Sequence, residues 1–538
     1  MLGTQRVTSR AASASPSVSL EKGKYRMRAP TSRSPLPPPK LSPNNGRTHT
    51  RPSTGQNNAY VTVLLLLLAS GCVVSFGLAY YLFTTRWANS NQPSRLKFAD
   101  DETQVVQVEA PQTACPSIAP GEKFLAYHTH SGFHNQRIAL ENALTLSHLL
   151  NRTLVIPPIR VGKPIHYCNF HALHQFLSLS DKVGLQHCAR LSPGSFLPPE
   201  CLGYFEYTHL PWDWLLDFAQ IGARHRYIFR GNHSDQWIRG CLGVDESDVL
   251  VLQESSRYQY RFLDAPTSNS ADSSDKFAEA ISIPQLRDSR EPLIQLGTLF
   301  GTTRLLLIGK ENYAIRRRVR EEMVFTNSLL AEISESIVER LGDIFVGAHV
   351  RLGDGGFAKS GKDNAHSIWW TLVQVAFNLT LDETIALQTS DSTTSGVSPP
   401  ILAPYAIHSA APPQSILPSP LRCHKPLYTQ PSLKPLNTPL YLATDAREPR
   451  NDSSLTLFFR TFPCVFTLAD VEDLLEPLDH VVNGLDGVKL KPFLMPFIDT
   501  MVLGKAWSVV GTTSSTFSAF ALEVLWPIYH GLEMKERG

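Results

Sequence analysis

An uncharged apolar segment divides this chain into two unequal parts. Val61–Phe83 contains no Asp, Glu, Lys or Arg and includes five consecutive leucines. About 20 apolar residues are enough to cross a bilayer as a helix. A cleaved signal peptide is the alternative, but the segment is too long for one, begins far from Met1 and follows a long polar tail. The sequence therefore predicts a transmembrane signal-anchor helix at residues 60–83.

The charges on either side of this segment predict its orientation. Residues 1–59 hold ten Lys and Arg side chains and a single acid, Glu21, whereas Asp100, Asp101 and Glu102 follow the segment. By the positive-inside rule the short tail stays cytoplasmic, and the large C-terminal part is lumenal or extracellular. We therefore expect a single-pass type II protein of the Golgi or ER membrane, with its folded part in the lumen.

Composition beyond the tail supports this placement. Taking ten basic residues and one acid from the totals of 50 and 48 leaves 40 basic and 47 acidic residues, so a nucleic-acid partner is not expected. Seven of the eight cysteines follow the apolar segment; disulfides are expected mainly among the four between 168 and 241, with an odd thiol left over. Candidate N-glycosylation triplets begin at Asn151, Asn232, Asn378 and Asn451.

The order of apolar runs predicts two α/β domains. An expected strand at 124–128, a helix whose apolar face recurs at Ala139, Ala143, Leu146 and Leu150, and a strand at 153–156 open the first domain. We place a disordered tail at 1–59, a stem at 84–120, an N-terminal domain at 121–343 and a C-terminal domain at 344–538. A Ser-, Thr- and Pro-rich stretch at 381–436 is expected to be a disordered insertion in the C-terminal domain.

The C-terminal domain opens with a strand that ends in a Gly-rich loop. The apolar run 344–350 stops at Arg351, and Gly353, Asp354 and Gly355 follow. Ligands of open α/β sheets bind outside the carboxyl ends of strands, where an Arg offers two parallel donors to a phosphate. A surface turn with an Arg–Asp ion pair is the alternative reading of this stretch alone.

Two further loops offer complementary chemistry. After an expected strand at 508–510, the residues 511–514 lead into a helix that opens at Ser515 or Thr516, where hydroxyl and N–H groups suit a phosphate. An ordinary Ser/Thr helix cap is the alternative. In the first domain, His134 and Asn135 follow the first strand. Asn135 can bond a phosphate or hydroxyl, and His134 can move a proton at neutral pH, although such residues often only close a turn.

Together these segments resemble a known family. Phe133-x-Asn135-Gln136 and the stretch 150–158 are similar to the opening of protein O-fucosyltransferases. His349-Val350-Arg351 with its Gly-Asp-Gly loop resembles the His-x-Arg motif that these enzymes share with α1,6-fucosyltransferases. The strand end at 442–445, an Asp at 499 and the terminal run 515–520 match further motifs in the expected order.

The resemblance implies a GT-B architecture, in which two Rossmann-like domains face a cleft and the C-terminal one holds GDP-fucose. It also implies inversion at the anomeric carbon without a bound metal. By position, Arg351 would bind the leaving β-phosphate. The other implied donor contacts are phosphate and fucose at Ser515, Thr516 and Phe517, nucleotide groups at His349, Asp445 and Asp499, and the sugar-phosphate at Phe133 and Asn135.

The residues are coherent with this chemistry. An Arg and a helix N-terminus stabilise negative charge where it develops on a leaving diphosphate. No Asp-x-Asp pair stands at a strand end, so neither a metal nor another cofactor is expected. Asp354 and His134 are equal candidates for the base. We expect a glycosyltransferase that carries fucose from GDP-fucose to a protein or glycan hydroxyl. Use of another nucleotide sugar, an inactive nucleotide-sugar- or glycan-binding relative, and a membrane-anchored scaffold remain alternatives.

Overall fold

The computed structural model describes residues 106–108, 115–191, 196–265, 276–353, 355–389, 399–408, 418 and 420–534, together with Ser70 and Ser75. The expected tail (1–59) lies outside these residues, as does the expected transmembrane helix (60–83) apart from the two serines. No helix among the described residues has both the length and the apolar character to cross a bilayer. The chain divides into two compact units, 1–100 and 101–538, and the second contains all the elements below.

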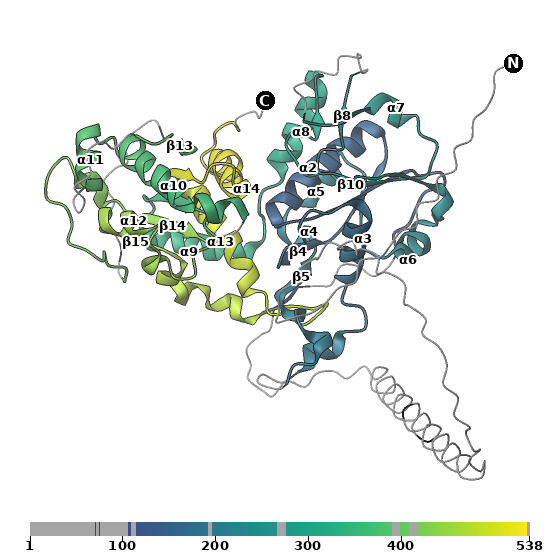
Figure 1. Ribbon diagram of the computed structural model, residues 1–538, viewed down its shortest axis with the longest axis horizontal. Helices are drawn as coiled ribbons and strands as arrows, with labels where there is room; N and C mark the ends of the chain where they lie inside the picture. Colours follow the sequence, from purple (N-terminus) through teal and green to yellow (C-terminus); the bar gives the residue numbers. More distant parts are fainter. Residues whose placement is uncertain are drawn as a thin grey trace, which may run out of the picture. The chain divides into compact units, whose positions relative to one another are not determined.

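The N-terminal half is built on a parallel five-stranded sheet (Figure 1). Its strands, in spatial order, are β6 (Tyr227–Phe229), β3 (Thr153–Ile156), β2 (Phe124–His128), β10 (Leu293–Thr298) and β7 (Val249–Leu252). Leu125 and Tyr127 of β2 pack into one hydrophobic core and Phe124 and Ala126 into another. Because both faces are covered, the strand is apolar along its whole length, as is usual in parallel sheets. The strand–helix–strand unit expected at 124–156 is confirmed, with α2 spanning Phe133–Leu150.

The C-terminal half contains a second five-stranded sheet. Its order is β13 (Tyr405–Ile407), β17 (Ser508–Gly511), β12 (Val346–Val350), β14 (Leu440–Thr444) and β15 (Val465–Phe466). All neighbours are parallel except β13, which runs antiparallel to β17 at the edge. The mixed α/β class and the two-sheet organisation that we expected are therefore present.

Smaller elements surround the two sheets. The minor strands are β1 (Val106–Val108), β4 (Ile159–Gly162), β5 (Tyr207–Leu210), β8 (Tyr260–Leu263), β9 (Glu279–Ser282), β11 (Leu305–Leu306) and β16 (Val481–Asn483). The other helices are α3 (Phe170–Leu179), α4 (Trp212–Leu215), α5 (Phe218–Gly222), α6 (Asp235–Trp237), α7 (Ile283–Arg287), α8 (Lys310–Glu322), α9 (Ser328–Leu341), α10 (Gly355–Thr371), α11 (Leu381–Thr389), α12 (Thr456–Thr461), α13 (Lys491–Lys505), α14 (Thr516–Phe520) and α15 (Trp526–Tyr529). Helical turns η9 (Leu468–His480) and η10 (Ala521–Leu525) lie beside α13 and after α14.

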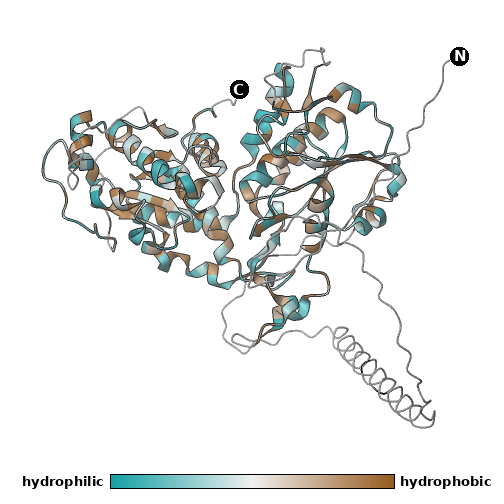
Figure 2. Cartoon of the chain, in the orientation of Figure 1, coloured by the Kyte–Doolittle hydropathy of each residue, from teal (hydrophilic) through white to brown (hydrophobic). Residues whose placement is uncertain are grey.

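The two halves share one hydrophobic core. Phe133 of α2 contacts Phe497 of α13, with ring centroids 4.7 Å apart, and Phe325 contacts both Phe497 and Phe520 at 5.4 and 5.3 Å. Phe325, Phe497 and Phe520 belong to a single buried cluster that includes residues of both sheets, and Phe133 packs against it. Figure 2 shows brown, apolar residues along the strands and brown residues alternating with teal, hydrophilic ones along the helices. The halves are therefore joined by continuous apolar packing.

Helix α9 belongs by its contacts to the C-terminal half. It packs against α13; Lys505 donates to the hydroxyl of Ser334 at 3.2 Å, and Arg340 pairs with Asp473 at 3.1 Å. The helix lies N-terminal to the boundary that we expected between residues 343 and 344. The apolar positions of α9 show that one face is buried but not which sheet it covers. The sequence therefore gives no reason to place the domain boundary before α9.

The expectation of a disordered insertion at 381–436 is wrong for much of that range. Residues 381–389 form α11, and 405–407 form the edge strand β13, in which Tyr405 pairs with Val510. Residues 420–437 are also described, and the amide of Asn437 exchanges hydrogen bonds with the backbone of Tyr428. Residues 390–398, 409–417 and 419 lie outside the described part. Periodicity fails as a guide here because the ordered pieces are short.

The disulfides differ from the expected set. Cys188–Cys201 lies within the expected region, but Cys241 pairs with Cys115, and Cys423 pairs with Cys464. Cys168 is the free thiol among the described cysteines. Partners 126 residues apart in sequence cannot be read from spacing alone. At the candidate glycosylation sites, Asn151, Asn378 and Asn451 are exposed and Asn232 is half-buried.

Candidate functional site

Three neighbouring parallel strands end at one edge of the second sheet. Arg351 follows β12, Asp445 follows β14 and Thr512 follows β17 directly. The backbone N–H of Arg351 donates to the hydroxyl of Thr512 at 2.9 Å, and that hydroxyl donates to the carbonyl of His349 at 3.0 Å. The loops at 351–353 and 512–515 are thus held against each other, at the strand ends where open α/β sheets bind ligands.

Asp445 organises the loop that carries Arg351. Its carboxylate accepts hydrogen bonds from the N–H groups of Leu352 and Gly353 at 2.7 and 2.9 Å, and it pairs with Nε of Arg351 at 3.1 Å. A Cβ on Gly353 would lie 2.6 Å from Oδ2 of Asp445, so any other residue here would have to displace that carboxylate. Both charged side chains remain about a third exposed. The guanidinium of Arg351 is thus a cation held at the carboxyl ends of the strands.

His349 lies beneath this edge as a neutral, fixed side chain. Its Nδ1 is 2.7 Å from the hydroxyl of Ser518, and its ring stacks on Phe517 with centroids 4.1 Å apart. Burial, followed by the charge of Arg351, lowers the pKa of His349 to about 3. A neutral imidazole that is 3% exposed holds α14 against β12. Any contact between His349 and a nucleotide stays a prediction.

The loop after β17 forms the helix start that we expected. Ser515 caps α14, because its hydroxyl accepts from the N–H of Ser518 at 3.4 Å. Helix α14 continues through η10 into α15. The cap interpretation is therefore correct for Ser515; a phosphate at the same position would have to share the hydroxyl with this cap.

The N-terminal half reaches this loop through Asn135. Its Oδ1 accepts a hydrogen bond from the hydroxyl of Thr516 at 2.9 Å. The two residues are 381 positions apart in sequence. The first and last loops that we singled out are thus brought together. The amide of Gln136, by contrast, is used within the N-terminal half, where it bonds the backbone of Arg160.

Phe133 and His134 are half-buried, and both pack against aromatic rings. The ring of Phe133 faces Trp212, Phe325 and Phe497 in the shared core. His134 lies between Phe517 and Phe520, each 5.1 Å away between ring centroids. Burial is the largest cause that lowers the pKa of His134 well below its usual value, and Arg137, His349 and Arg351 add to it. The imidazole is neutral at physiological pH, but such a low pKa makes it a weak proton acceptor.

Two expected site residues are not found at this edge: Asp499 lies elsewhere, and Asp354 is outside the described residues. Asp499 of α13 accepts a hydrogen bond from the hydroxyl of Tyr441 at 2.6 Å, and burial raises its pKa to about 7. Tyr441 pairs with Gly347, three positions before the end of β12. Asp499 therefore bonds beneath the sheet, away from the strand ends. Asp354, the other candidate base, lies outside the described residues.

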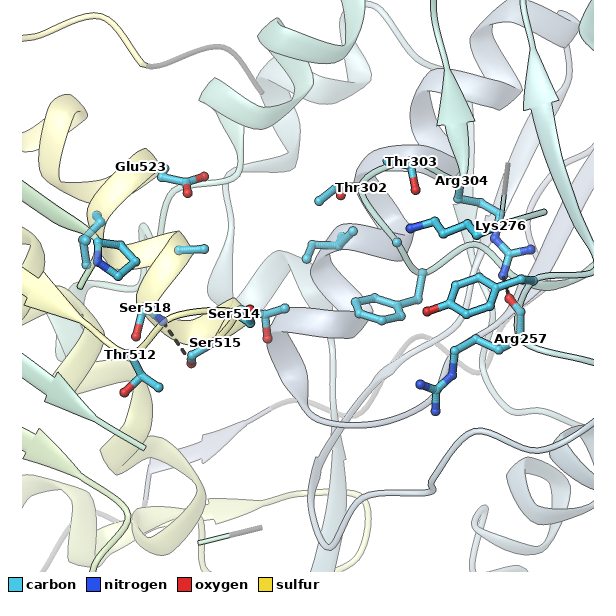
Figure 3. Close-up of a pocket in the computed structure, with 18 of the residues that line it drawn as sticks. Arg257, Lys276, Thr302, Thr303, Arg304, Thr512, Ser514, Ser515, Ser518 and Glu523 are labelled. Carbon is cyan, nitrogen blue, oxygen red and sulfur yellow. Dashed lines mark hydrogen bonds between the residues drawn. The ribbon is translucent and has the colours of Figure 1, made fainter. Parts of the chain in front are cut away.

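A cavity of about 790 Å³ opens beside the loop that follows β17 (Figure 3). Thr512, Ser514, Ser515 and Thr516 line it from the C-terminal half. Its volume is within the range of ligand sites in proteins. Arg351 is not among the lining residues, although Thr512, which accepts its N–H, is. The expected convergence of the Arg351 guanidinium and Ser515 on one pyrophosphate stays a prediction.

The opposite wall of the cavity was not predicted from the sequence. Arg257, Lys276, Thr302, Thr303 and Arg304 line it from the N-terminal half. Residues 299–304 follow the last residue of β10, so the rule that loops after parallel strands carry sites points to them. For Arg257 and Lys276, which lie far from that strand end in sequence, we find no signal that would have selected them.

Two groups among the described residues bring potential metal ligands together. In the first, His187 lies beside Cys188 and Cys201, whose sulfurs are joined in a disulfide. In the second group, Asp181 and His209 lie beside His233, whose Nδ1 is 2.7 Å from Asp181. The positive charges of Arg160, Arg230 and Lys182 act on these histidines and disfavour a further cation.

The chain is similar to known proteins in one short segment of its sequence and in the alignment of its fold. A segment of 39 residues, 7% of the chain, is 59% identical to O-fucosyltransferase 30 from Arabidopsis thaliana, which confirms the predicted resemblance over that segment. The match spans 8% of the length of that relative. No protein-family model matches the chain. Crystal structures of POFUT1 in complex with GDP-fucose and in the apo form align with 75% and 76% of this chain and with 94% and 95% of theirs, at 11% identity and TM-scores of 0.32 and 0.31.

Proposed function

We propose that this chain is a glycosyltransferase that transfers fucose from GDP-fucose to a hydroxyl of a protein or glycan. The observation that carries the proposal is the meeting of Arg351, Asp445 and Thr512 at three adjacent strand ends, beside a cavity that both halves line. The segment shared with a protein named as an O-fucosyltransferase supports the choice of sugar.

The proposed role of Arg351 is to stabilise the leaving diphosphate. Its Nε is engaged by Asp445, and a planar guanidinium has the geometry that matches phosphate oxygens. Because Asp445 also binds the backbone of the same loop, the guanidinium is oriented before a donor arrives. A preorganised donor of this kind typically contributes ~3–4 kcal/mol to the transition state. Thr516 and the capped turn at Ser515 would hold the phosphate and sugar from the adjacent loop.

We further propose that the transfer inverts the anomeric carbon and needs no metal. In this proposal the positive charge that a metal would supply comes from Arg351. The acceptor hydroxyl requires a base, and the packing of His134 between two phenylalanines favours Asp354 for that role. The basic tail and apolar segment support a type II membrane protein of the Golgi or ER with the folded part in the lumen.

An inactive relative that only binds a nucleotide sugar or glycan is the second candidate. It is favoured by the Arg351–Asp445 pair, which leaves the guanidinium partly neutralised, and by the absence of Arg351 from the cavity lining. Such a protein would bind GDP-fucose without turnover.

Release of GDP from GDP-fucose, with and without a chelator, tests the proposal on the full chain. Arg351→Ala should lower the rate of release by roughly 100-fold or more. Lys362→Ala is the control, because Lys362 is an exposed cation on the helix that follows the same loop. A loss below tenfold would remove Arg351 from the proposed role. Binding without release would favour the inactive relative, and release from another nucleotide sugar alone would replace the donor.

A further inference from the structure

The wall of the cavity contributed by the N-terminal half carries two exposed cations, Arg257 and Lys276. In Figure 3 they lie across the cavity from Thr512, Ser514 and Ser515. Among the described residues, neither cation forms an ion pair with a carboxylate. Their contacts are with rings: Lys276 Nζ lies 5.3 Å from the centroid of Tyr258, and the guanidinium of Arg257 lies 5.5 Å from that of Tyr167. Their charge is thus available to a ligand.

A third cation, Arg304, has a different function. It is 1% exposed, and its Nη1 donates to Glu254 and to the carbonyl of Tyr260, both at 2.6 Å. Its Nη2 donates to the backbone carbonyl of Arg257 at 2.8 Å. Arg304 is therefore neutralised by Glu254 and fixes the loop from which Arg257 projects. The buried ion pair thus fixes the backbone at Arg257, while the side chain of Arg257 is exposed at the cavity wall.

The loop that carries Thr302 and Thr303 is also fixed. The amide of Asn142 on α2 donates to the carbonyls of Leu299 and Gly301 at 2.8 and 3.0 Å. This positions the hydroxyls of Thr302 and Thr303 on the same wall. The aromatic rings of Tyr258, Phe277 and Phe300 complete it.

The opposite wall offers little negative charge to balance the two cations. Glu523 is the acid among the lining residues, and it interacts with the buried Arg320 of α8. The remaining lining groups from the C-terminal half are hydroxyls and apolar side chains. A ligand that fills the cavity therefore meets positive charge on one side and neutral donors on the other.

We propose that this wall binds the acceptor and that the acceptor is an acidic glycan, with a carboxylate-bearing sugar placed against Arg257 and Lys276. This inference rests on the proposed function, because it assigns the second substrate of the same cavity. An Arg fork matches a carboxylate in two parallel hydrogen bonds. The rings can pack against the apolar face of a sugar while the threonine hydroxyls bond its edge. A neutral glycan would leave both cations unpaired.

Binding of two matched oligosaccharides to the full chain tests this assignment. The probes are a tetrasaccharide of galacturonic acid and the same tetrasaccharide with its carboxyl groups reduced to alcohols, measured by calorimetry with and without GDP. The acidic probe should bind at least fivefold more tightly. The double variant R257Q/K276Q should raise its Kd by roughly three- to tenfold and leave the Kd of the reduced probe unchanged, since two exposed ion pairs contribute about that much.

The control variant K310Q/R318Q removes two exposed cations of α8 that do not line the cavity, and it should bind both probes as the unaltered protein does. Equal affinity for the two probes would overturn the proposal, as would an equally long poly-glutamate peptide that binds as tightly as the acidic glycan. A rise in the Kd of GDP in R257Q/K276Q would assign the cations to the donor instead. If the unaltered protein binds the acidic glycan but not GDP, the proposed function is refuted and this glycan site stands.

Discussion

Nε of Arg351 lies 3.1 Å from Oδ2 of Asp445, and the same carboxylate accepts hydrogen bonds from the N–H groups of Leu352 and Gly353. One side chain at the end of β14 thereby holds both the backbone and the guanidinium of the loop after β12. The pair is about a third exposed, so its contribution to folding stability is small. Its consequence lies in orientation, because a guanidinium held at Nε presents its two terminal nitrogens in a defined direction.

We expect Asp445→Asn to lower the rate of GDP release roughly 10- to 100-fold, because a charge-assisted hydrogen bond contributes about 1.5–3 kcal/mol. Gly353→Ala should reproduce much of this loss, since its Cβ would lie 2.6 Å from the Asp445 carboxylate and displace it. Gly356→Ala is the matched control, because a Cβ there meets open space. Kinetics in which Gly353→Ala behaves like Gly356→Ala would contradict the orienting role of Asp445.

The hydrogen bond between Thr516 and Asn135 predicts an energetic coupling between the two halves. Thr516→Val keeps the shape of the side chain and removes its donor, and Asn135→Ala removes the acceptor. Urea unfolding of both single variants and the double variant should give a coupling of about 0.5–1.5 kcal/mol. Thr513→Val, at an exposed neighbour in the same loop, should show no coupling to Asn135→Ala. Strictly additive losses for the first pair would show that the bond does not contribute.

The burial of Asp499 predicts a loss of stability as the pH rises from about 4 to about 7. Its folded-state pKa, about 7, is above the usual value of 3.8, so the folded carboxyl binds a proton more tightly than the unfolded one. The resulting stabilisation is complete below pH 3.8 and is lost as the pH rises through 7. Asp499→Asn should therefore be at least as stable as the unaltered protein at pH 8, with the Kd of GDP changed by less than about threefold. A large rise in that Kd would restore Asp499 to the nucleotide site.

His349 predicts the opposite dependence on pH. Its pKa falls to about 3 on folding, from a usual value of 6.5, so the unfolded chain takes up a proton that the folded one does not. Stability is complete above pH 6.5 and is lost as the pH falls toward 3, by at most about 1.4 kcal/mol per pH unit for this histidine. His349→Gln, which cannot be protonated, should show a shallower loss between pH 6 and 4 in urea titrations. Parallel curves for the two proteins would contradict this account.

The elements around the strand ends were predictable because their signals are local. Apolar runs that stop at Arg351 and Asp445, and one that stops at the Gly-Thr-Thr-Ser loop, give β12, β14 and β17. The periodic face of α2 was predictable for the same reason. Strand ends in a parallel sheet meet at one edge, so the proximity of these loops followed from the pattern.

The remaining features depend on contacts that no local pattern encodes. From the sequence alone, the side chain of Phe133 could point to a ligand or to the core. Its ring contacts Phe497 of α13, which places it against the core. The Cys115–Cys241 pairing and the edge strand β13 each require a partner more than 100 residues away. Arg257 follows β7 and Lys276 precedes β9, and only the folded chain brings both to one cavity wall. Tertiary packing, and not propensity, determines each of these.

The aromatic packing of Phe133, Phe325, Phe497 and Phe520 makes the folded part of the chain indivisible. A fragment cut at residue 344 would leave its α13 rings without their partners and would lose α9, which covers the same helix. Truncated proteins that carry the Arg351 loop alone would expose these apolar faces to water and would tend to self-associate. The folded unit must consequently be made and handled whole, and a swing of one sheet away from the other would have to break the packing that keeps both in place.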